Sequence, residues 1–588
     1  EEPPQAPLGA RGEPEEVHGA ETLPAPRGAP GQTGAGSRWC IVLPAAVMSS
    51  ARTSPADAPG AALSVTAAAL ACAGTYLAAR LLLRGGHGFP LDDSYIHLQF
   101  ARNLAAGHGL AYNAGELVTG STAPLWTALV TLLGAAGGAV AAVKLAGVLL
   151  HLASVHATLV LGREMGLSRG GARLAAAFTL GTGWLVWGAL SGLEVPLFTL
   201  LSLWGVILHL RERGGSEPGR SLAVLALAAL ARPEGLLLIL LALADRLLLW
   251  RREEAGLALA WPPLAPVAHG LAAAALLLVP MALFSTAVGG SPLPTTFFAK
   301  GAGSSIGLPQ TSYLFHVLGI LFREQPAPVL VAGAGVVFLV RRLGGRDDRG
   351  LLPALWLFAL PLAFAVLSPR GGSPLVGNFG RYFFPLFPFL ALVGAAGLEA
   401  AGTALGPRLS AGSLRLPLRP ALAVLVLLPS VFSLVRGAGR YTQAVGNVRD
   451  GDVAVTSWLA PRLPPGATLA VNDVGVLKYR LPENRVLDLA GILDPEVVRY
   501  RAEALAAGRP AVEGDLRFLA ETRPDYLVIF PDWFPGLMAL DDAGFRPLHQ
   551  VTVPGNIALG DDRIVVLSTP WTRAPLRQPP AGASGSPG

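Results

Sequence analysis

The feature that most constrains this chain is a series of long apolar stretches that recur over most of its length. A helix needs roughly 20 predominantly apolar residues to cross a bilayer, and most of the stretches approach that length. They predict about eleven transmembrane helices. Only 14% of the residues are charged, whereas soluble proteins carry about 25%, so a soluble fold is excluded. The stretches are 61–83, 140–162, 172–189, 194–210, 221–231, 234–250, 265–288, 326–341, 351–368, 382–404 and 420–436.

The sequence changes in character along its length, and these changes predict the domain organisation. The N-terminal residues are rich in Pro, Gly and Ala without apolar periodicity, which is typical of disorder, and Met48 is our hypothesis for the translation start. After the last apolar stretch, short β-type runs separated by turn residues predict a small soluble α/β domain. The predicted parts are a disordered segment 1–60, a transmembrane domain 61–436 with a first outer loop at about 84–139, an extracytoplasmic α/β domain 437–575, and a disordered tail 576–588.

Alternate loops between the apolar stretches differ in charge, and this difference predicts the topology. One set is rich in arginine and is therefore expected in the cytoplasm, with the amino terminus inside and the C-terminal domain outside. Arg80 and Arg84 go against this rule, and the segment 124–134 must lie in the interface, because counting it as a crossing would reverse every later loop. The arginines of the inner set are Arg163, Arg173, Arg211, Arg213, Arg220, Arg251, Arg252, Arg341, Arg342, Arg346, Arg349, Arg408, Arg415 and Arg419.

Two adjacent carboxylates, Asp92 and Asp93, directly follow the first apolar stretch. A carboxylate near the headgroup boundary is partly desolvated, and it is a candidate general base for activating a hydroxyl group. The alternative is a structural role, because an Asp immediately before the helical pattern YIHLQFARNLA also caps a helix. One Asp can cap while the other reacts.

The remainder of the first outer loop supplies three more candidate binding residues, His97, Arg102 and Glu116. His97 lies four residues after Asp93, so the two would share a helix face and could bind a divalent metal or orient each other. For all three, solvation at the surface or a simple polar contact is the alternative interpretation. The pair alone is a weak indication of a metal site.

Two polar motifs interrupt later apolar stretches. Glu194 in SGLEVP is a candidate binding residue, but Ser191 and Glu194 also match a helix capping box. Arg232 and Glu234 in ARPEG lie at membrane depth, where charges are costly and are usually paired or functional. We interpret Arg232 as a binding residue, with mutual neutralisation of the two charges as the alternative.

The sequence also resembles a known family. The stretch Leu91–Trp126, LDDSYIHLQFARNLAAGHGLAYNAGELVTGSTAPLW, resembles the first outer loop of bacterial GT-C membrane glycosyltransferases, in a branch similar to the mycobacterial arabinofuranosyltransferases. The order of SGLEVPLF, ARPEG, LPTTFFAK and GRYFFPLFPFL is similar to that branch, as is VNDVGVLKYRLPENRVLDLAGILDPE. The resemblance covers about 90–570. It implies a GT-C-like fold in the bacterial inner membrane, a polyprenyl-phosphate sugar as donor, and an acidic base in the first outer loop.

The resemblance adds two cations to the candidate site, Lys300 in LPTTFFAK and Arg381 in GRYFFP. Both end outward-facing apolar segments, at the level where the phosphate of a lipid-linked donor would lie, and both side chains suit a phosphate. Snorkelling of a long cationic side chain to the interface is the alternative. No cofactor is implied with certainty, because some GT-C enzymes need a divalent metal ion and others do not.

The sequence therefore predicts a glycosyltransferase that uses a polyprenyl-phosphate sugar donor and a glycan, lipid or protein acceptor of the cell envelope. A multi-pass transporter of a lipid or small polar solute is the alternative, since buried Arg and Glu would also suit a substrate pathway. The polar motifs, however, show no inverted repeat and gather on one face of the membrane. The net charge of +6 comes from scattered arginines rather than a basic patch, so nucleic acid is not an expected partner.

Overall fold

A computed structural model divides the chain into two units, Glu1–Pro59 and Gly60–Gly588, and every residue that it describes lies in the second. The predicted disordered segment 1–60, the first apolar stretch 61–83 and the end of the predicted tail fall outside the described residues. The described residues are 87–134, 139–213, 219–247, 250–253, 256–259, 264–295, 311–344, 347–367, 378–409, 418–539 and 544–578.

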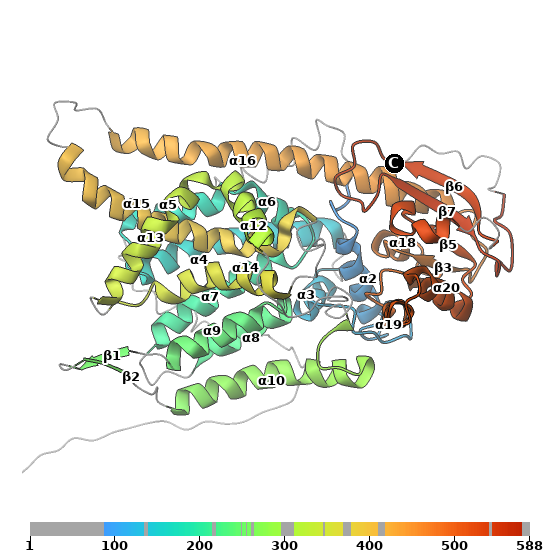
Figure 1. The fold of residues 1–588 in the computed structure, drawn as a ribbon, viewed down its shortest axis with the longest axis horizontal. Helices are drawn as coiled ribbons and strands as arrows, with labels where there is room; N and C mark the ends of the chain where they lie inside the picture. The colour runs from blue at the N-terminus through green and yellow to red at the C-terminus, as the bar shows by residue number, and fades with distance from the viewer. Residues whose placement is uncertain are drawn as a thin grey trace, which may run out of the picture. The chain divides into compact units, whose positions relative to one another are not determined.

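The fold is mostly helical and has the architecture of a multi-pass membrane protein (Figure 1). Among the described residues, five helical segments are long and apolar enough to cross a membrane. The predicted number of about eleven crossings stays a prediction. The five segments are Ala139–Glu164 (α4), Val195–Glu212 (α7), Leu264–Gly289 (α10), Pro326–Leu343 within α13 (Pro326–Gly344), and Gly380–Ala404, which joins the 3-10 helix η2 (Asn378–Leu386) to α15 (Phe387–Leu409).

Shorter helices complete the helical part. The predicted stretch 172–189 is not one helix, because it breaks at Gly181 and Thr182, between α5 and α6. The segment 124–134, which the sequence predicts in the interface, forms α3, whose 11 residues rise only about 16 Å and cannot span a bilayer. The shorter helices are α2 (Asp93–Ala105), α3 (Pro124–Gly134), α5 (Arg169–Leu180), α6 (Gly183–Leu190), α8 (Arg220–Ala231), α9 (Gly235–Leu247), α12 (Thr311–Glu324) and α14 (Leu351–Leu367), and a two-stranded hairpin joins β1 (Trp250–Glu253) to β2 (Gly256–Leu259).

The break that the sequence indicated around 232 separates α8 from α9. The chain folds back so tightly there that a Cβ atom on Gly235 would overlap the backbone of Ala228 and Ala229. Only glycine allows this approach of backbone to backbone. Arg232 and Glu234 therefore lie in a sharp turn between two short helices, and their side chains are free to point away from both helix axes.

The C-terminal part contains a five-stranded sheet with the order β4-β3-β5-β7-β6. The strand β3 pairs in parallel with β4 and β5, whereas β7 is antiparallel to β5 and β6. All four residues of β5 are buried, as expected for a central strand. The elements are β3 (Thr468–Val471), α18 (Gly475–Arg480), β4 (Arg485–Asp488), α19 (Pro495–Ala506), α20 (Ala511–Thr522), β5 (Tyr526–Ile529), η4 (Pro531–Trp533), α21 (Pro535–Met538), β6 (Arg546–Thr552) and β7 (Arg563–Ser568).

One long helix, α16 (Leu418–Val448), runs from the apolar helices to this sheet (Figure 1). It continues without a break past residue 437 and passes through a π-helical turn, Arg449–Val453, into α17 (Ala454–Leu459). A second connection between the two regions is α2, which packs against α18. The first outer loop and the C-terminal sheet are therefore held together by side-chain contacts.

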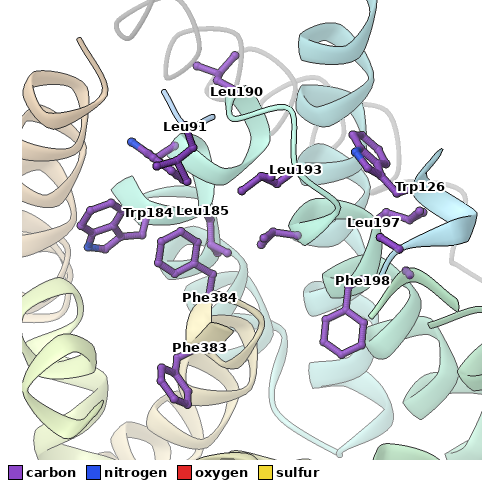
Figure 2. Packing of buried hydrophobic residues seen from close by; sticks show 14 of the residues in the cluster. Leu91, Trp126, Trp184, Leu185, Leu190, Leu193, Leu197, Phe198, Phe383 and Phe384 are labelled. Carbon is purple, nitrogen blue, oxygen red and sulfur yellow. The ribbon is translucent and has the colours of Figure 1, made fainter. Parts of the chain in front are cut away.

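Aromatic side chains of α6, α12 and η2 pack together in the helical part. Trp184 of α6 packs against Phe384 of η2 (Figure 2), with 5.2 Å between their ring centroids. Trp187 packs edge-on against the same phenyl ring. Phe383 of η2 packs against Tyr313 of α12. This cluster fixes η2, and η2 carries one of the predicted site residues, Arg381.

Candidate active site

The Asp92 carboxylate joins the first outer loop to the C-terminal sheet region. One oxygen accepts a hydrogen bond from the backbone N–H of Gly475 at 2.7 Å, and the other accepts one from Val476 at 2.6 Å. These amides belong to the first turn of α18, where N–H groups have no partner within the helix. Asp92 makes no cap hydrogen bond to its own helix. Its structural role is therefore to cap a helix that lies 383 residues further along the chain.

Asp92 is enclosed, and its surroundings contain other acids. Burial raises the pKa of Asp92 to about 7, although the two amide hydrogen bonds lower it and the nearby charge of Asp93 raises it further. Burial likewise raises the pKa of Asp488 to about 6 and holds the pKa of Asp473 well above its usual range. Only 9% of Asp92 is exposed, so a substrate hydroxyl has little access to this carboxylate.

Asp93 differs from its neighbour in exposure and in its partner. Its side chain is 32% exposed, and its Oδ2 lies 2.7 Å from NH1 of Arg381. Arg381 comes from η2 and is itself only 7% exposed, with its guanidinium carbon 5.6 Å from the ring centroid of Tyr382. The structure thus places an accessible carboxylate beside a buried cation.

Glu194 stands at the start of α7 and lies between two cationic or basic groups. Its carboxylate lies 3.4 Å from Nε2 of His97 and 3.1 Å from NH1 of Arg232. Arg232 also forms an ion pair with Glu234 at 3.0 Å. The mutual neutralisation of the two ARPEG charges is therefore present, in addition to the pair between Arg232 and Glu194. The alternative capping box is absent here, because Glu194 is itself the N-cap residue and makes no side-chain cap hydrogen bond.

The aromatic ring of Tyr382 connects these two groups of charges. The guanidinium carbon of Arg232 lies 4.8 Å from its centroid, and that of Arg381 lies 5.6 Å away. Four separate segments, namely α2, the start of α7, the α8–α9 turn and η2, therefore bring Asp93, His97, Glu194, Arg232 and Arg381 into one cluster, which we call the open cluster. Tyr382 was not singled out from the sequence, although an aromatic residue next to an interfacial cation was visible there.

Other predicted binding residues lie elsewhere. Arg102 donates a hydrogen bond to the carbonyl of Tyr479 at 2.8 Å and stacks on its ring, so it fastens α2 to α18. Glu116 forms an exposed ion pair with Arg485 at 2.7 Å. Lys300 lies outside the described residues.

The described segments contain no group of three or more His, Cys, Asp or Glu side chains arranged to hold a metal ion. His97, which the sequence paired with Asp93, has Glu194 as its acidic neighbour. Its Nδ1 atom is buried and has no hydrogen-bond partner among the described residues. Nδ1 of His97 is therefore an unused donor or acceptor atom within the open cluster.

Comparison with known proteins identifies the fold. ArnT from Cupriavidus metallidurans in the apo state is 17% identical, with a TM-score of 0.50, over 86% of this chain and 98% of that one. The archaeal oligosaccharyltransferase AglB from Archaeoglobus fulgidus, in complex with an inhibitory peptide and a dolichol-phosphate, is 11% identical, with a TM-score of 0.52, over 81% of this chain and 71% of that one. This chain has the GT-C glycosyltransferase fold.

Two sequence comparisons cover parts of the chain. A terminal β-(1→2)-arabinofuranosyltransferase of Mycobacterium tuberculosis is 36% identical over an alignment of 187 residues, which covers 28% of this chain and 29% of that relative. A family model described as a domain of unknown function, DUF8728, matches residues 440–568. The match to the arabinofuranosyltransferase agrees with the branch that the first-loop motifs resemble, and it covers less than a third of that protein's length.

Proposed function

We propose that this protein is a membrane glycosyltransferase that moves a sugar from a polyprenyl-phosphate donor to a glycan, lipid or protein acceptor of the cell envelope. The observation that carries the proposal is the Asp93–Arg381 pair, an accessible carboxylate beside a buried cation in a GT-C fold. The similarity to an arabinofuranosyltransferase supports the same reaction class. The nature of the sugar depends on pocket shape and is left open.

In the proposed mechanism, Asp93 accepts the proton of the acceptor hydroxyl as that oxygen attacks the anomeric carbon of the donor. The bond from the anomeric carbon to the phosphate oxygen breaks, and the lipid phosphate leaves with the electron pair. Arg381 and Arg232 would stabilise this phosphate, because a guanidinium group offers forked N–H donors to its oxygens. Asp92 is a positioning residue that holds α18 against the base-bearing helix.

Two variants, each compared with the parent protein, test the role of the carboxylates. Purified protein in lipid vesicles is given a radiolabelled polyprenyl-phosphate sugar, and Asp93→Asn and Asp92→Asn are each compared with the parent. We expect Asp93→Asn to lose about 10²- to 10⁴-fold of the transfer rate while inserting normally, since it cannot accept a proton. Asp92→Asn should lose less and should melt at a lower temperature. Full transfer by both variants would show that neither carboxylate is the base.

A divalent cation is a further proposal for this site, because Asp93 is accessible and a hard carboxylate ligand is available. Transfer measured with and without a chelator tests it. Loss of activity that Mg²⁺ or Mn²⁺ restores would support the cation, whereas unchanged activity would remove it from the mechanism.

The proposed orientation places the open cluster on the outer side of the bacterial cell membrane, with the amino terminus inside. Arginine-rich loops gather at the other end of the helices, where Arg342 binds the carbonyl of Met165, Arg211 binds Glu164 and Arg213 binds Asp348. Cysteine labelling of intact cells tests the orientation. Leu343→Cys should resist an impermeant reagent and Ala507→Cys should react, and the reverse pattern would overturn the proposal.

A further inference from the structure

A small cationic pocket lies outside the open cluster, where α12 meets α6 and α16. Its volume is about 160 Å³. Three arginines and one glutamate among its lining residues give it a formal charge of +2 with histidine neutral. The lining residues are Trp184, His316, Ile320, Arg323, Glu324, Arg436 and Arg440.

The acidic residue of this pocket, Glu324, already has partners within the protein. Glu324 forms an ion pair with Arg436 and accepts a hydrogen bond from the hydroxyl of Ser433 at 2.5 Å. The same hydroxyl oxygen accepts the backbone N–H of Gly183 at 2.8 Å, so α6, α12 and α16 are fastened at this point. Within the described segments, Arg323 and Arg440 have no carboxylate partner, and the Arg440 guanidinium carbon lies 5.6 Å from the ring centroid of Trp184.

The pocket lies at a membrane boundary. Directly after Arg323 and Glu324, α13 begins at Pro326, and its 19 residues rise about 28 Å, close to the thickness of the hydrocarbon core. The far end of α13 carries Arg342, which binds the carbonyl of Met165 in the arginine-rich end of the helices. The pocket therefore lies at the opposite boundary from those loops.

Contacts with η2 place the pocket in the same leaflet as the open cluster. Ile320 packs against Gly380, the residue before Arg381. Trp184 packs against Phe384, as Figure 2 shows. These two side chains separate the pocket from η2, so the pocket and the open cluster are neighbours with a hydrophobic wall between them.

Exposed apolar side chains flank the pocket on both helices. On α12, Phe315 is 72% exposed and Phe322 is 44% exposed, and on α16 Phe432 is 66% exposed, near Val431 and Val435. At the level of a bilayer such faces contact lipid chains. A cationic hollow between two lipid-facing surfaces matches a molecule with an anionic head and apolar tails.

We propose that this pocket binds the phosphate headgroup of a membrane lipid, at a site separate from the open cluster. Its volume is below the roughly 300 Å³ of pockets that enclose a whole small molecule, so it admits a headgroup while the chains lie along α12 and α16. Arg323 and Arg440 donate to the phosphate oxygens as charge-assisted hydrogen bonds. The proposal does not depend on the transfer reaction.

Lipid binding to the purified full-length protein tests this site, measured by native mass spectrometry with three probes: a polyprenyl phosphate, phosphatidylglycerol and an uncharged polyprenol. The double variant Arg323→Gln/Arg440→Gln should bind at least one phosphate lipid about tenfold more weakly or worse, which corresponds to about 1.4 kcal/mol. Arg440→Lys should retain part of the affinity, because lysine keeps the charge. Whichever phosphate lipid shows the loss identifies the source of the headgroup.

The matched control is Arg341→Gln, an exposed arginine at the other end of α13. It should bind the lipids as the parent does, and the melting temperatures of all variants should confirm that they are folded. Equal binding of the uncharged polyprenol, or equal affinity in the folded double variant and the parent, would overturn the proposal. Binding of inorganic phosphate alone, without either phosphate lipid, would also overturn it.

Discussion

Helix α7 has a group of buried charges at each end, and the two groups differ in access to solvent. At its start, Glu194 belongs to the open cluster, in which the Asp93 side chain is 32% exposed. At its end, His209 binds Asp245 at 2.6 Å and Glu212 binds Arg246 at 2.7 Å, with all four side chains between 0% and 5% exposed. We call this second group the closed cluster.

The same residue types serve different purposes in the two clusters. A buried charge is tolerated when an opposite charge compensates it, and the buried charges of both clusters have opposite charges beside them. In the closed cluster, Glu212 also accepts hydrogen bonds from the backbone and hydroxyl of Ser221, and Asp245 also pairs with Arg213 at 3.0 Å. The open cluster ends on an accessible carboxylate. The four side chains that define the closed cluster are shielded from solvent, whereas the open cluster includes a carboxylate that solvent reaches directly.

The largest expected effect on stability comes from breaking the closed cluster. Arg246→Met should lower the free energy of unfolding by about 3–5 kcal/mol, because it leaves the Glu212 carboxylate buried without its partner. Denaturant unfolding in detergent measures this loss. Transfer per folded molecule should stay unchanged.

The double variant Arg246→Met/Glu212→Leu is the control for that experiment. It removes both charges and should recover much of the lost stability, since no uncompensated ion remains. Normal stability in Arg246→Met alone would show that the closed cluster is not structural.

Removing a cation from the open cluster should affect transfer more than stability. Arg381→Gln removes the ion pair between Arg381 and Asp93, but water can reach this carboxylate, so the melting temperature should fall less than in Arg246→Met. Loss of a charge-assisted hydrogen bond to the donor phosphate costs about 1.5–3 kcal/mol, or roughly a 10- to 150-fold lower rate. Transfer kinetics with varied donor concentration measure the change.

Arg381→Lys separates charge from geometry in the same assay. It should recover part of the rate, because a lysine supplies the charge without the guanidinium fork. If Arg381→Gln transfers sugar at the same rate as the parent, this arginine is not part of the proposed phosphate site.

The effect expected from Asp92 on stability depends on pH. Its folded-state pKa of about 7 lies above the ordinary value of 3.8, so the folded protein holds this proton more tightly than the unfolded chain. The resulting stabilisation is complete below pH 3.8 and is lost as the pH rises through about 7, at no more than about 1.4 kcal/mol per pH unit. Asp92→Asn should remove the contribution of Asp92 to the slope of stability against pH.

Melting temperatures between pH 5 and pH 8 test the prediction for Asp92. Asp488 titrates with the same sign, because burial also raises its pKa, so Asp92→Asn should reduce the fall in stability with pH without abolishing it. Parallel curves for the parent and the variant would show that Asp92 does not titrate in this range.

The sequence predicted which residues carry charge near the membrane boundary, but not how they pair. The order of the motifs placed Asp93, Glu194, Arg232 and Arg381 on one side, and contacts in the structure bring these four together. Local patterns suggested a cap for Asp92 and a capping box for Glu194, yet both side chains bind distant segments. Pairing across hundreds of residues depends on tertiary packing, which no local spacing encodes.

The smallest effect is expected at Glu116, which the sequence grouped with the binding residues of the first outer loop. Glu116 and Arg485 are 44% and 45% exposed, and an exposed pair of this kind contributes about 0–1 kcal/mol. Glu116→Gln should therefore leave both the melting temperature and the transfer rate close to those of the parent, and Arg485→Gln should behave alike. A transfer rate lowered tenfold or more in Glu116→Gln, with Arg485→Gln unaffected, would mean that Glu116 contacts the substrate directly. The boundary of the site would then extend beyond the open cluster along the first outer loop, and solvent access alone would no longer separate its members from the surface charges around them.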